Sequence, residues 1–317
     1  MRTLVTGGAG FIGSHLCDRL IEAGHAVAVV DDMSLGRESN VAHLLDHSAF
    51  ALHRTSILAP DFDAIVAEGR FDRVFHMAAN SDIQAGSRDR SVDLDRTFLT
   101  TWHVCESMAR HAVRELVYAS TSAVYGEVDE LIAEDHGPLL PISYYGAAKL
   151  AGEAFCSAYA AREAIRTWVF RFPNVVGSRA THGVILDFIE RLQRDPEALE
   201  VLGDGTQEKP YLYVHDLLDA ILLVVDAVRP APHEVFNVGP ETATRVRRIA
   251  ETVVEVMGLS GKTEIRYGDE PRGWPGDVSR FAYDLRKIHA LGWSTGASSD
   301  DAMRRAVEDI WRERTRP

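Results

Sequence analysis

Short apolar runs alternate with helical patterns along the first half of the 317-residue chain. Runs with strand character occupy residues 4–6, 27–30, 50–53, 73–76, 116–119 and 168–170. The first run is followed by apolar positions at helical spacing, Leu16, Leu20 and Ile21. The alternation predicts an α/β fold in which a doubly wound parallel sheet has helices on both faces. Ligands bind beyond the carboxyl ends of the strands in such a sheet.

This regularity weakens after Asn174. A glycine-containing stretch at residues 177–183 precedes helical patterns, short strands near residues 199–202 and 234–238, and an arginine-rich helix near residues 244–257. We therefore expect residues 1–175 to form the sheet domain, with strand contributions from later residues. Residues 176–317 are expected to form a smaller α/β portion. The strand that contains Val169 still belongs to the first sheet.

Composition narrows the class of protein. A hydrophobic content of 46% in 317 residues is enough for a large buried core. The net charge of -13 and the lack of a Lys/Arg run argue against nucleic-acid binding. No apolar run approaches the roughly 18 residues that span a bilayer, and the chain starts directly on a strand, so we expect a cytoplasmic protein that does not bind membranes. Cys17, Cys105 and Cys156 have spacings that fit neither a disulfide framework nor a metal site, which predicts buried thiols and no metal.

Three glycines follow the first strand at the spacing Gly7, Gly10, Gly13 and precede a helix. Glycines at this place let the backbone turn tightly, let a pyrophosphate approach the helix N-terminus, and let the helix pack close to the strand. A tight structural turn is the alternative for an isolated glycine motif. Strands on both sides favour a Rossmann-like dinucleotide-binding domain.

The second strand ends in Asp31-Asp32, about twenty residues after the glycine turn. A carboxylate at that distance can bind a ribose 2′-hydroxyl. A 2′-phosphate would call instead for a nearby arginine, and the first one, Arg37, lies six residues beyond Asp31. The expected cofactor is therefore NAD.

Tyr145 and Lys149 are four residues apart in a helical pattern, which places a phenol and an ammonium on one helical face. A phenol with a pKa of about 10 becomes a usable base near neutral pH if a neighbouring positive charge favours its phenolate form. Lys149 could supply that charge. By itself this spacing also occurs by chance, as an exposed lysine beside a packed ring.

Taken together, these motifs resemble the extended short-chain dehydrogenase/reductase family of nucleotide-sugar epimerases and dehydratases. The resemblance covers nearly the whole chain and rests on the glycine turn, Asp31, His76-Met-Ala-Ala, Ser120-Thr-Ser-Ala-Val-Tyr-Gly126, Tyr145-x-x-x-Lys149 and Arg171-Phe-Pro-Asn-Val-Val-Gly177. Within the family, the chain is most similar to UDP-glucose 4-epimerases of the archaeal type. The stretches that carry this similarity are Thr181-His-Gly-Val-Ile185, Leu202-Gly-Asp-Gly-Thr206, Tyr211-Leu-Tyr-Val-His-Asp216 and Arg272-Gly-Trp-Pro-Gly-Asp277.

The resemblance implies three catalytic residues. Tyr145 as phenolate accepts the proton of a sugar hydroxyl while the hydride of the same carbon passes to NAD⁺. Lys149 lowers the pKa of Tyr145 and hydrogen-bonds the nicotinamide ribose, and Thr121 hydrogen-bonds the reacting oxygen. The resulting 4-keto sugar turns in the pocket and takes the hydride back on its other face, without net oxidation. UDP-glucose and UDP-galactose are the expected pair.

The residues after Thr121 discriminate between reactions. Family members that dehydrate the sugar carry Asp-Glu there, and those that decarboxylate a uronic acid keep the glutamate. This chain has Ser122 and Ala123, which cannot act as carboxylic acids. Epimerisation is therefore favoured.

The resemblance also implies two sets of contacts. The residues expected at the cofactor are Gly7, Gly10, Phe11, Ile12, Gly13, Asp31, Asp32, Ser56, Ile57, Met77, Ala78, Ala79, Ser120, Tyr145, Lys149 and Pro173. Those expected at the substrate are Ser122, Asn174, Val184, Lys209, Tyr211, Arg272 and Asp277.

Several of these positions depart from the family pattern. Lys209 stands where bacterial 4-epimerases have an arginine, and a point charge controls phosphate direction less than a planar fork. Ser56 and Thr97 stand where the family often has an acid and an asparagine, so looser NAD binding is expected. Phe281 is near the position that gates the C2 substituent and favours an unacetylated hexose, while Arg280 leaves a uronate open.

Two alternatives remain from the sequence. One is an epimerase of a UDP-uronate or of another nucleotide sugar. The other is a non-catalytic NAD-binding sensor, which would have no reason to retain Thr121, Tyr145 and Lys149 together. Helices expected at residues 97–109 and 141–161 resemble those that form the dimer interface of the family, so a homodimer is expected.

Overall fold

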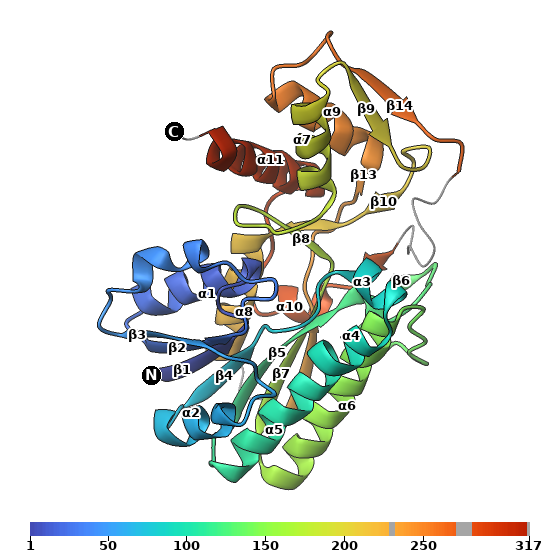
Figure 1. Ribbon diagram of the computed structural model, residues 1–317. Helices are drawn as coiled ribbons and strands as arrows, with labels where there is room; N and C mark the ends of the chain where they lie inside the picture. The colour runs from blue at the N-terminus through green and yellow to red at the C-terminus, as the bar shows by residue number, and fades with distance from the viewer. Residues whose placement is uncertain (228–231, 271–280, 316–317) are drawn as a thin grey trace. The chain divides into compact units, whose positions relative to one another are not determined.

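A seven-stranded sheet in the order β12-β7-β5-β4-β1-β2-β3 is the centre of the fold (Figure 1). The structure is a computed structural model and describes residues 1–227, 232–270 and 281–315. The strands of this sheet are β1 (Arg2–Thr6), β2 (Ala26–Asp31), β3 (Phe50–Arg54), β4 (Arg73–His76), β5 (Glu115–Thr121), β7 (Arg166–Phe172) and β12 (His233–Asn237). The pairs β1–β2, β1–β4, β2–β3 and β4–β5 are parallel, with Thr3 in register with Val27 on one side and Arg73 on the other. The predicted doubly wound α/β fold is confirmed.

The apolar core lies on both faces of the sheet because alternate side chains of each strand point in opposite directions. One face buries residues of β1, β2, β4, β5 and β7 against three helices, α2 (Asp61–Gly69), α5 (Thr100–Arg110) and α6 (Tyr144–Glu163). Helix α1 (Phe11–Glu22) lies on the opposite face (Figure 1). Cys105 and Cys156 are buried in the first of these layers, and Cys17 is buried in α1.

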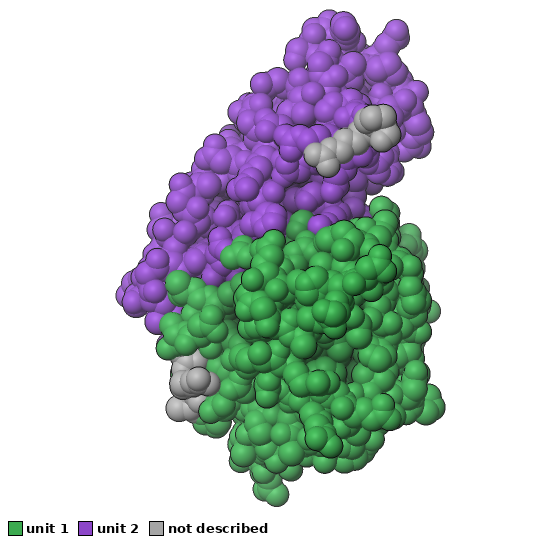
Figure 2. Space-filling view, turned by 90° about the vertical axis from the view of Figure 1, so that its left-hand side faces the viewer, with its two compact units in different colours: residues 1–126, 136–171, 221–236 green, residues 127–135, 172–220, 237–317 purple. Residues whose placement is uncertain are grey.

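The chain divides into two compact units, coloured in Figure 2. Unit 1 comprises Met1–Gly126, His136–Arg171 and Ile221–Phe236, and unit 2 comprises Glu127–Asp135, Phe172–Ala220 and Asn237–Pro317. The strand expected near residues 234–238 in the C-terminal portion is β12, which adds to the edge of the seven-stranded sheet beside β7. Helix α8 (Val214–Ala227) precedes it and has residues in both units.

Three helix boundaries differ from the sequence pattern for local reasons. Helix α6 begins at Tyr144 because the Ser143 hydroxyl accepts a hydrogen bond from Gly146 N at 3.0 Å and caps the helix. The helix expected at residues 97–109 is longer, because α4 (Ser91–Asp93) and a π-helical turn, η3 (Leu94–Leu99), precede α5. The arginine-rich helix α9 (Val246–Val256) starts two residues later than expected, because Thr244–Arg245 forms strand β13.

The remaining short elements of unit 1 are η1 (Glu38–Asn40), η2 (Ala42–Leu44), α3 (Ile83–Arg88) and η4 (Ser122–Val124).

Unit 2 is built from small sheets and helices. Its strand pairs are β8 (Asn174–Val176) with β11 (Tyr211–Tyr213), β9 (Ala198–Val201) with β14 (Glu264–Tyr267), β10 (Glu208–Lys209) with β13, and β6 (Leu131–Ile132) with β15 (Ala282–Tyr283). Its other helices are α7 (Val184–Arg194), α10 (Arg286–His289) and α11 (Ser299–Thr315). No helix in the described ranges is both long and apolar enough to cross a membrane.

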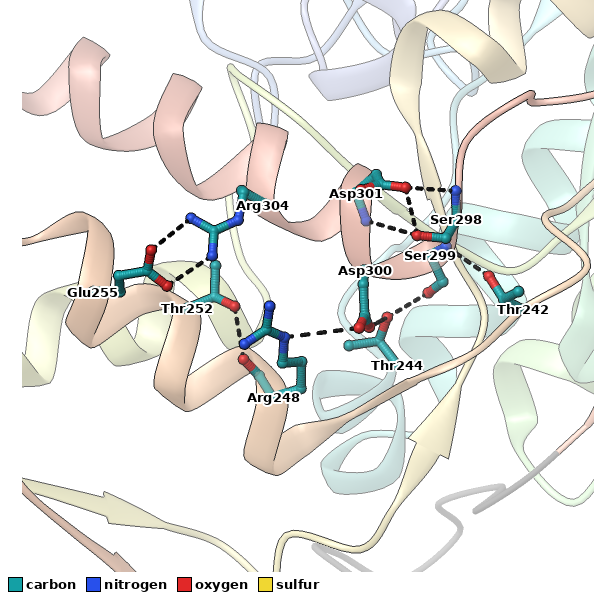
Figure 3. Close-up of polar contacts among 10 residues, drawn as sticks. All are labelled: Thr242, Thr244, Arg248, Thr252, Glu255, Ser298, Ser299, Asp300, Asp301 and Arg304. Atoms are coloured by element: carbon teal, nitrogen blue, oxygen red, sulfur yellow. Dashed lines mark hydrogen bonds and ion pairs between the residues drawn. The ribbon is translucent and has the colours of Figure 1, made fainter.

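Hydroxyl and carboxylate side chains hold the first turns of α11 in unit 2 (Figure 3). Ser299 N donates to the Thr242 hydroxyl at 2.8 Å, and the Thr244 hydroxyl is 2.7 Å from Ser299 Oγ. One turn further, the guanidinium of Arg304 forms two hydrogen bonds with the carboxylate of Glu255 on α9, the shorter of them 2.7 Å. These contacts fix α11 against α9 and β13.

Candidate active site

Two glycines let α6 approach β5 and the turn that follows it. A Cβ on Gly146 would lie 2.5 Å from the carbonyl oxygen of Ala123, and a Cβ on Gly152 would lie 2.3 Å from the Tyr118 hydroxyl. Any larger residue at either position would push the helix away from the strand. The close approach places Tyr145, in the first turn of α6, next to the end of β5.

Tyr145 and Thr121 are hydrogen-bonded to each other. The Thr121 hydroxyl also accepts a hydrogen bond from Ala123 N at 3.2 Å, which leaves its proton available for the phenol oxygen. Thr121 is buried at the end of β5, and Tyr145 is half-buried. The structure therefore brings together two of the three predicted catalytic residues in direct contact.

Lys149 is almost fully buried, and its ammonium is held by groups of β5. Its Nζ donates to the carbonyl oxygen of Ala119 at 2.6 Å and lies 4.8 Å from the centroid of the Tyr118 ring. Burial lowers the pKa of Lys149 to about 8, against raising contributions from Cys156 and Glu153. Lys149 is thus a cation near neutral pH, and the carbonyl oxygen of Ala119 and the Tyr118 ring stabilise its charge.

Burial has the largest effect on the pKa of Tyr145. Desolvation raises that pKa above its usual value, the hydrogen bond with Thr121 lowers it, and the carboxylate of Asp93 raises it. The Lys149 side chain is directed to Ala119 and Tyr118. Thr121 thus favours the phenolate form of Tyr145 against the larger effect of burial.

The glycine turn leaves no room for side chains. Gly7 has a φ of 71°, and a Cβ on it would lie 2.7 Å from Ala78 N. A Cβ on Gly13 would lie 2.1 Å from the Gly7 carbonyl oxygen. Helix α1 begins directly after Gly10, with no side-chain cap and no acidic residue in its first turn. Phe11 and Ile12 are in that first turn, so its backbone N–H groups suit the pyrophosphate of a dinucleotide.

Asp31 supports this turn from the end of β2. Its carboxylate accepts hydrogen bonds from Ala9 N and Met33 N, both at 2.9 Å. Burial raises the pKa of Asp31, and these two hydrogen bonds lower it. Asn40, which the sequence did not single out, donates its side-chain amide to Ala9 O at 2.9 Å and is buried. Each carboxylate oxygen of Asp31 retains a lone pair that can accept from a ribose hydroxyl.

The other residues expected at the cofactor follow the carboxyl ends of strands. Asp32 is exposed and accepts from Ser34 N, and the Ser56 hydroxyl accepts from Leu58 N. The loop after β4 is held by Thr97, whose hydroxyl accepts from Asn80 N at 3.1 Å. Residues of unit 1 in this group that are buried or half-buried are Ile57, Met77, Ala78, Ala79 and Ser120.

Thr97 therefore has a structural partner. It is fully buried in the π-helical turn η3, and such turns are frequent at functional sites. Asn80 continues the contact by donating its side-chain amide to Asp93 at 2.9 Å. Asn80 and Asp93 were not among the expected site residues, and the sequence signal for Asn80 was its position in the short segment that follows β4.

Four of the residues expected at the substrate, Asn174, Val184, Lys209 and Tyr211, belong to unit 2, and Ser122 is in η4 of unit 1. Asn174 is exposed on β8 and is in register with buried Tyr211 on β11. Val184 starts α7 after Gly183, whose φ is 118°, and Lys209 is on β10 in register with Thr244. Pro173, expected at the cofactor, is buried in unit 2 directly before β8. Arg272, Asp277 and Arg280 lie outside the described residues. Phe281 is half-buried with its ring edge against Tyr283.

In the part of the chain that the structure describes, no group of three His, Cys, Asp or Glu side chains could hold a metal ion.

Comparison with known proteins identifies the family. Residues 3–239 match the NAD dependent epimerase/dehydratase family. The chain belongs to that family. This confirms the family predicted from the motifs and establishes NAD as the cofactor class, for which the glycine turn and Asp31 form a suitable cradle.

Individual relatives match over the whole chain. A UDP-glucose 4-epimerase of Mycolicibacterium smegmatis is 31% identical over 318 residues, which cover 97% of this chain and 98% of the relative. The crystal structure of a UDP-galactose 4-epimerase is 40% identical, with a TM-score of 0.88 and coverage of 99% of both chains. That of the Thermotoga maritima UDP-glucose 4-epimerase with UDP-glucose is 30% identical, with a TM-score of 0.87 and coverage of 100% of both chains.

Proposed function

We propose that this protein is an NAD-dependent epimerase that inverts C4 of a nucleotide-diphosphate sugar, with UDP-glucose and UDP-galactose as its substrate pair. The observation that carries the proposal is the hydrogen bond between Tyr145 and Thr121 beside the buried ammonium of Lys149. The names of the relatives support the substrate pair.

The chain's own residues perform the proton transfer. Tyr145 Oη takes the proton of the sugar hydroxyl, and the single hydroxyl proton of Thr121 then turns from the phenol oxygen to the sugar oxygen that carries the developing charge. Bound NAD⁺ supplies a hydride acceptor and a positive ring charge. The hydrogen bond from Thr121 lowers the pKa of Tyr145 against the larger raising effect of burial, and the positive charges of Lys149 and of the bound nicotinamide ring would favour the phenolate further. Lys149, held through Ala119, orients the cofactor ribose.

The turn after Thr121 supports epimerisation over elimination. Ser122 and Ala123 occupy η4, immediately beyond the catalytic hydroxyl. Neither side chain can protonate a leaving hydroxyl or stabilise the loss of a carboxylate as a carboxylic acid does. The reaction therefore returns the hydride to the same carbon.

For the substrate, we propose that the diphosphate binds Asn174, Lys209 and the backbone at Val184. Val184 is at the N-terminus of the eleven-residue helix α7, where free N–H groups favour an anion. Ser122, Tyr211, Arg272 and Asp277 complete the proposed substrate set. Pro173 is proposed to contact the cofactor.

The test is to incubate the purified protein with UDP-galactose, without added cofactor, and to separate the products. We expect UDP-glucose to appear, because NAD is regenerated in each cycle. UDP-glucuronate and other UDP-, dTDP-, CDP- and GDP-sugars are assayed in parallel. Faster turnover of UDP-glucuronate would reassign the substrate to a uronate. An absence of product from every sugar, with NAD bound, would favour the non-catalytic sensor.

We further propose that the protein is a homodimer. Large apolar side chains of η3, α5 and α6 are exposed in unit 1, with Leu94 52%, Trp102 38% and Phe155 38% accessible. The ring of Phe155 on α6 packs against Phe98 of η3, 5.2 Å between centroids, so these two elements share an apolar surface. A second copy of the chain would cover it.

Light scattering after size exclusion is expected to give about 70 kDa, twice the 35.1 kDa of one chain. Phe155→Glu places a charge in this apolar surface and is expected to give a monomer. Leu58→Glu, which alters an equally exposed leucine before α2, serves as the control and should remain dimeric. A mass of one chain for the unaltered protein would contradict the proposal.

A further inference from the structure

A buried ion pair joins α6 to β7 in unit 1. Arg171 Nη2 is 2.6 Å from Glu153 Oε2, and Arg171 Nε lies 3.0 Å from Oε1 of the same carboxylate. Both side chains are only 5% exposed. The arrangement is bidentate, which fixes the direction of both side chains as well as their separation.

Two hydroxyl side chains of the β5 segment complete the cluster. Ser120 Oγ donates to Glu153 Oε1 at 2.5 Å, and Arg171 Nη1 donates to the Tyr125 hydroxyl at 2.8 Å. The Arg171 guanidinium also lies 4.8 Å from the centroid of the Tyr125 ring. Ser120 is the residue before Thr121, and Tyr125 follows η4. The cluster therefore contacts the chain on both sides of Thr121, at Ser120 and at Tyr125.

Glu153 belongs to the same helical face as the proposed base. It follows Lys149 by four residues and Tyr145 by eight, which are one and two turns of α6. Glu153 also raises the pKa of Lys149. The Glu153 carboxylate thus contacts Ser120, next to Thr121 at the end of β5. Glu153 itself is on α6, the helix that carries Tyr145 and Lys149.

We propose that Glu153 and Arg171, with Ser120 and Tyr125, form a positioning cluster that sets the Thr121 hydroxyl against Tyr145. The expected change in turnover rests on the proposed function. The expected change in the contact between Thr121 and Tyr145 does not. Neither Glu153 nor Arg171 is required to touch substrate or cofactor.

A buried ion pair is weak evidence for a role in stability, because apolar residues of similar volume often replace one without loss. Sub-ångström placement of a reacting group, in contrast, requires directional contacts. The double variant Glu153→Met/Arg171→Met separates the two roles. It removes both charges of the pair together. Because Glu153 also raises the pKa of buried Lys149, the pH profile of kcat is measured as well, to separate a change in the charge of Lys149 from a misplaced Thr121.

We expect this double variant to fold, to retain NAD and to keep KM within about threefold, while kcat falls by about 10- to 100-fold. The matched control is Arg73→Met/Glu115→Met. That pair is also buried, at 2.8 Å with side chains 5% and 9% exposed, but it joins the starts of β4 and β5, away from the strand ends that carry the site. The control should keep the unaltered kcat. Equal kcat in the two double variants would overturn the proposal.

Tyr125→Phe is the conservative variant that tests the cluster if the double variant does not fold. It deletes one hydrogen bond of Arg171 and keeps the ring. We expect kcat to fall by about three- to tenfold with KM unchanged, and an unchanged kcat would count against the cluster.

A readout without turnover separates this inference from the proposed function. Thr121 is observed through its methyl group in threonine-labelled protein by NMR, assigned with Thr121→Val. Because the Thr121 side chain is hydrogen-bonded to Tyr145, we expect the chemical shift of its methyl group to move in the cluster variants and to stay constant in the Arg73/Glu115 control. A constant shift in the cluster variants would overturn the inference even if the unaltered protein turns over no sugar. Loss of turnover by the unaltered protein together with a moved shift would refute only the proposed function.

Discussion

Replacing Tyr145 by phenylalanine is expected to lower kcat for epimerisation by about 1,000-fold, because the substitution removes the phenol oxygen proposed to take the proton of the sugar hydroxyl. The ring and the first turn of α6 are retained, so NAD should stay bound. Steady-state kinetics and the absorbance of released cofactor after denaturation measure the two effects separately.

The neighbouring Tyr144 provides the control. Its ring is 47% exposed and lies 5.6 Å from the Arg90 guanidinium, outside the hydrogen-bonded set of Tyr145. Tyr144→Phe should therefore keep nearly full activity. Substantial residual turnover in Tyr145→Phe would show that another group is the base.

Gly13→Ala is expected to have the largest effect on the cofactor site. The new Cβ would meet the Gly7 carbonyl oxygen at 2.1 Å and two further backbone atoms at 2.9 Å, and a backbone cannot move aside as a flexible side chain can. We expect a loss of about 3 kcal/mol in the free energy of unfolding. We also expect that NAD no longer accompanies the protein through gel filtration.

Gly137→Ala is the matched substitution, since a Cβ there meets nothing within 4 Å. It should leave both the denaturation midpoint and the bound NAD unchanged. If Gly13→Ala retained both, the tight approach of α1 to the glycine turn would not be a requirement of this fold.

Local pattern was sufficient for most of the fold. The six strands of the first half were each predicted within two residues of the observed bounds, because each is an apolar run ended by polar or turn residues. Strand contributions from residues after 175 were expected, but the sequence did not specify that β12 is the strand that joins this sheet. That strand pairs with β7 across more than sixty residues of chain, and nothing in its own short sequence specifies which edge it joins.

At the candidate site, too, local sequence pattern predicted some features and not others. Helical periodicity alone placed Tyr145 and Lys149 on one face, and it also places Glu153 there, one turn beyond Lys149. The spacing could not show where the Lys149 ammonium is directed. Its Nζ donates to the carbonyl oxygen of Ala119, thirty residues earlier in the chain.

By itself, the sequence determined the α/β class, the dinucleotide turn, the acid at Asp31 and the residue types of the proposed acid–base set. These properties depend on near neighbours in the chain, through backbone freedom and helical or strand period. The tertiary structure alone decided that the Lys149 ammonium is held by the carbonyl oxygen of Ala119, that Thr121 is the hydrogen-bond partner of Tyr145, and that Glu153 and Arg171 meet in a bidentate pair. Those contacts join a helix to two different strands, and only the packing of α6 against the sheet fixes their distances.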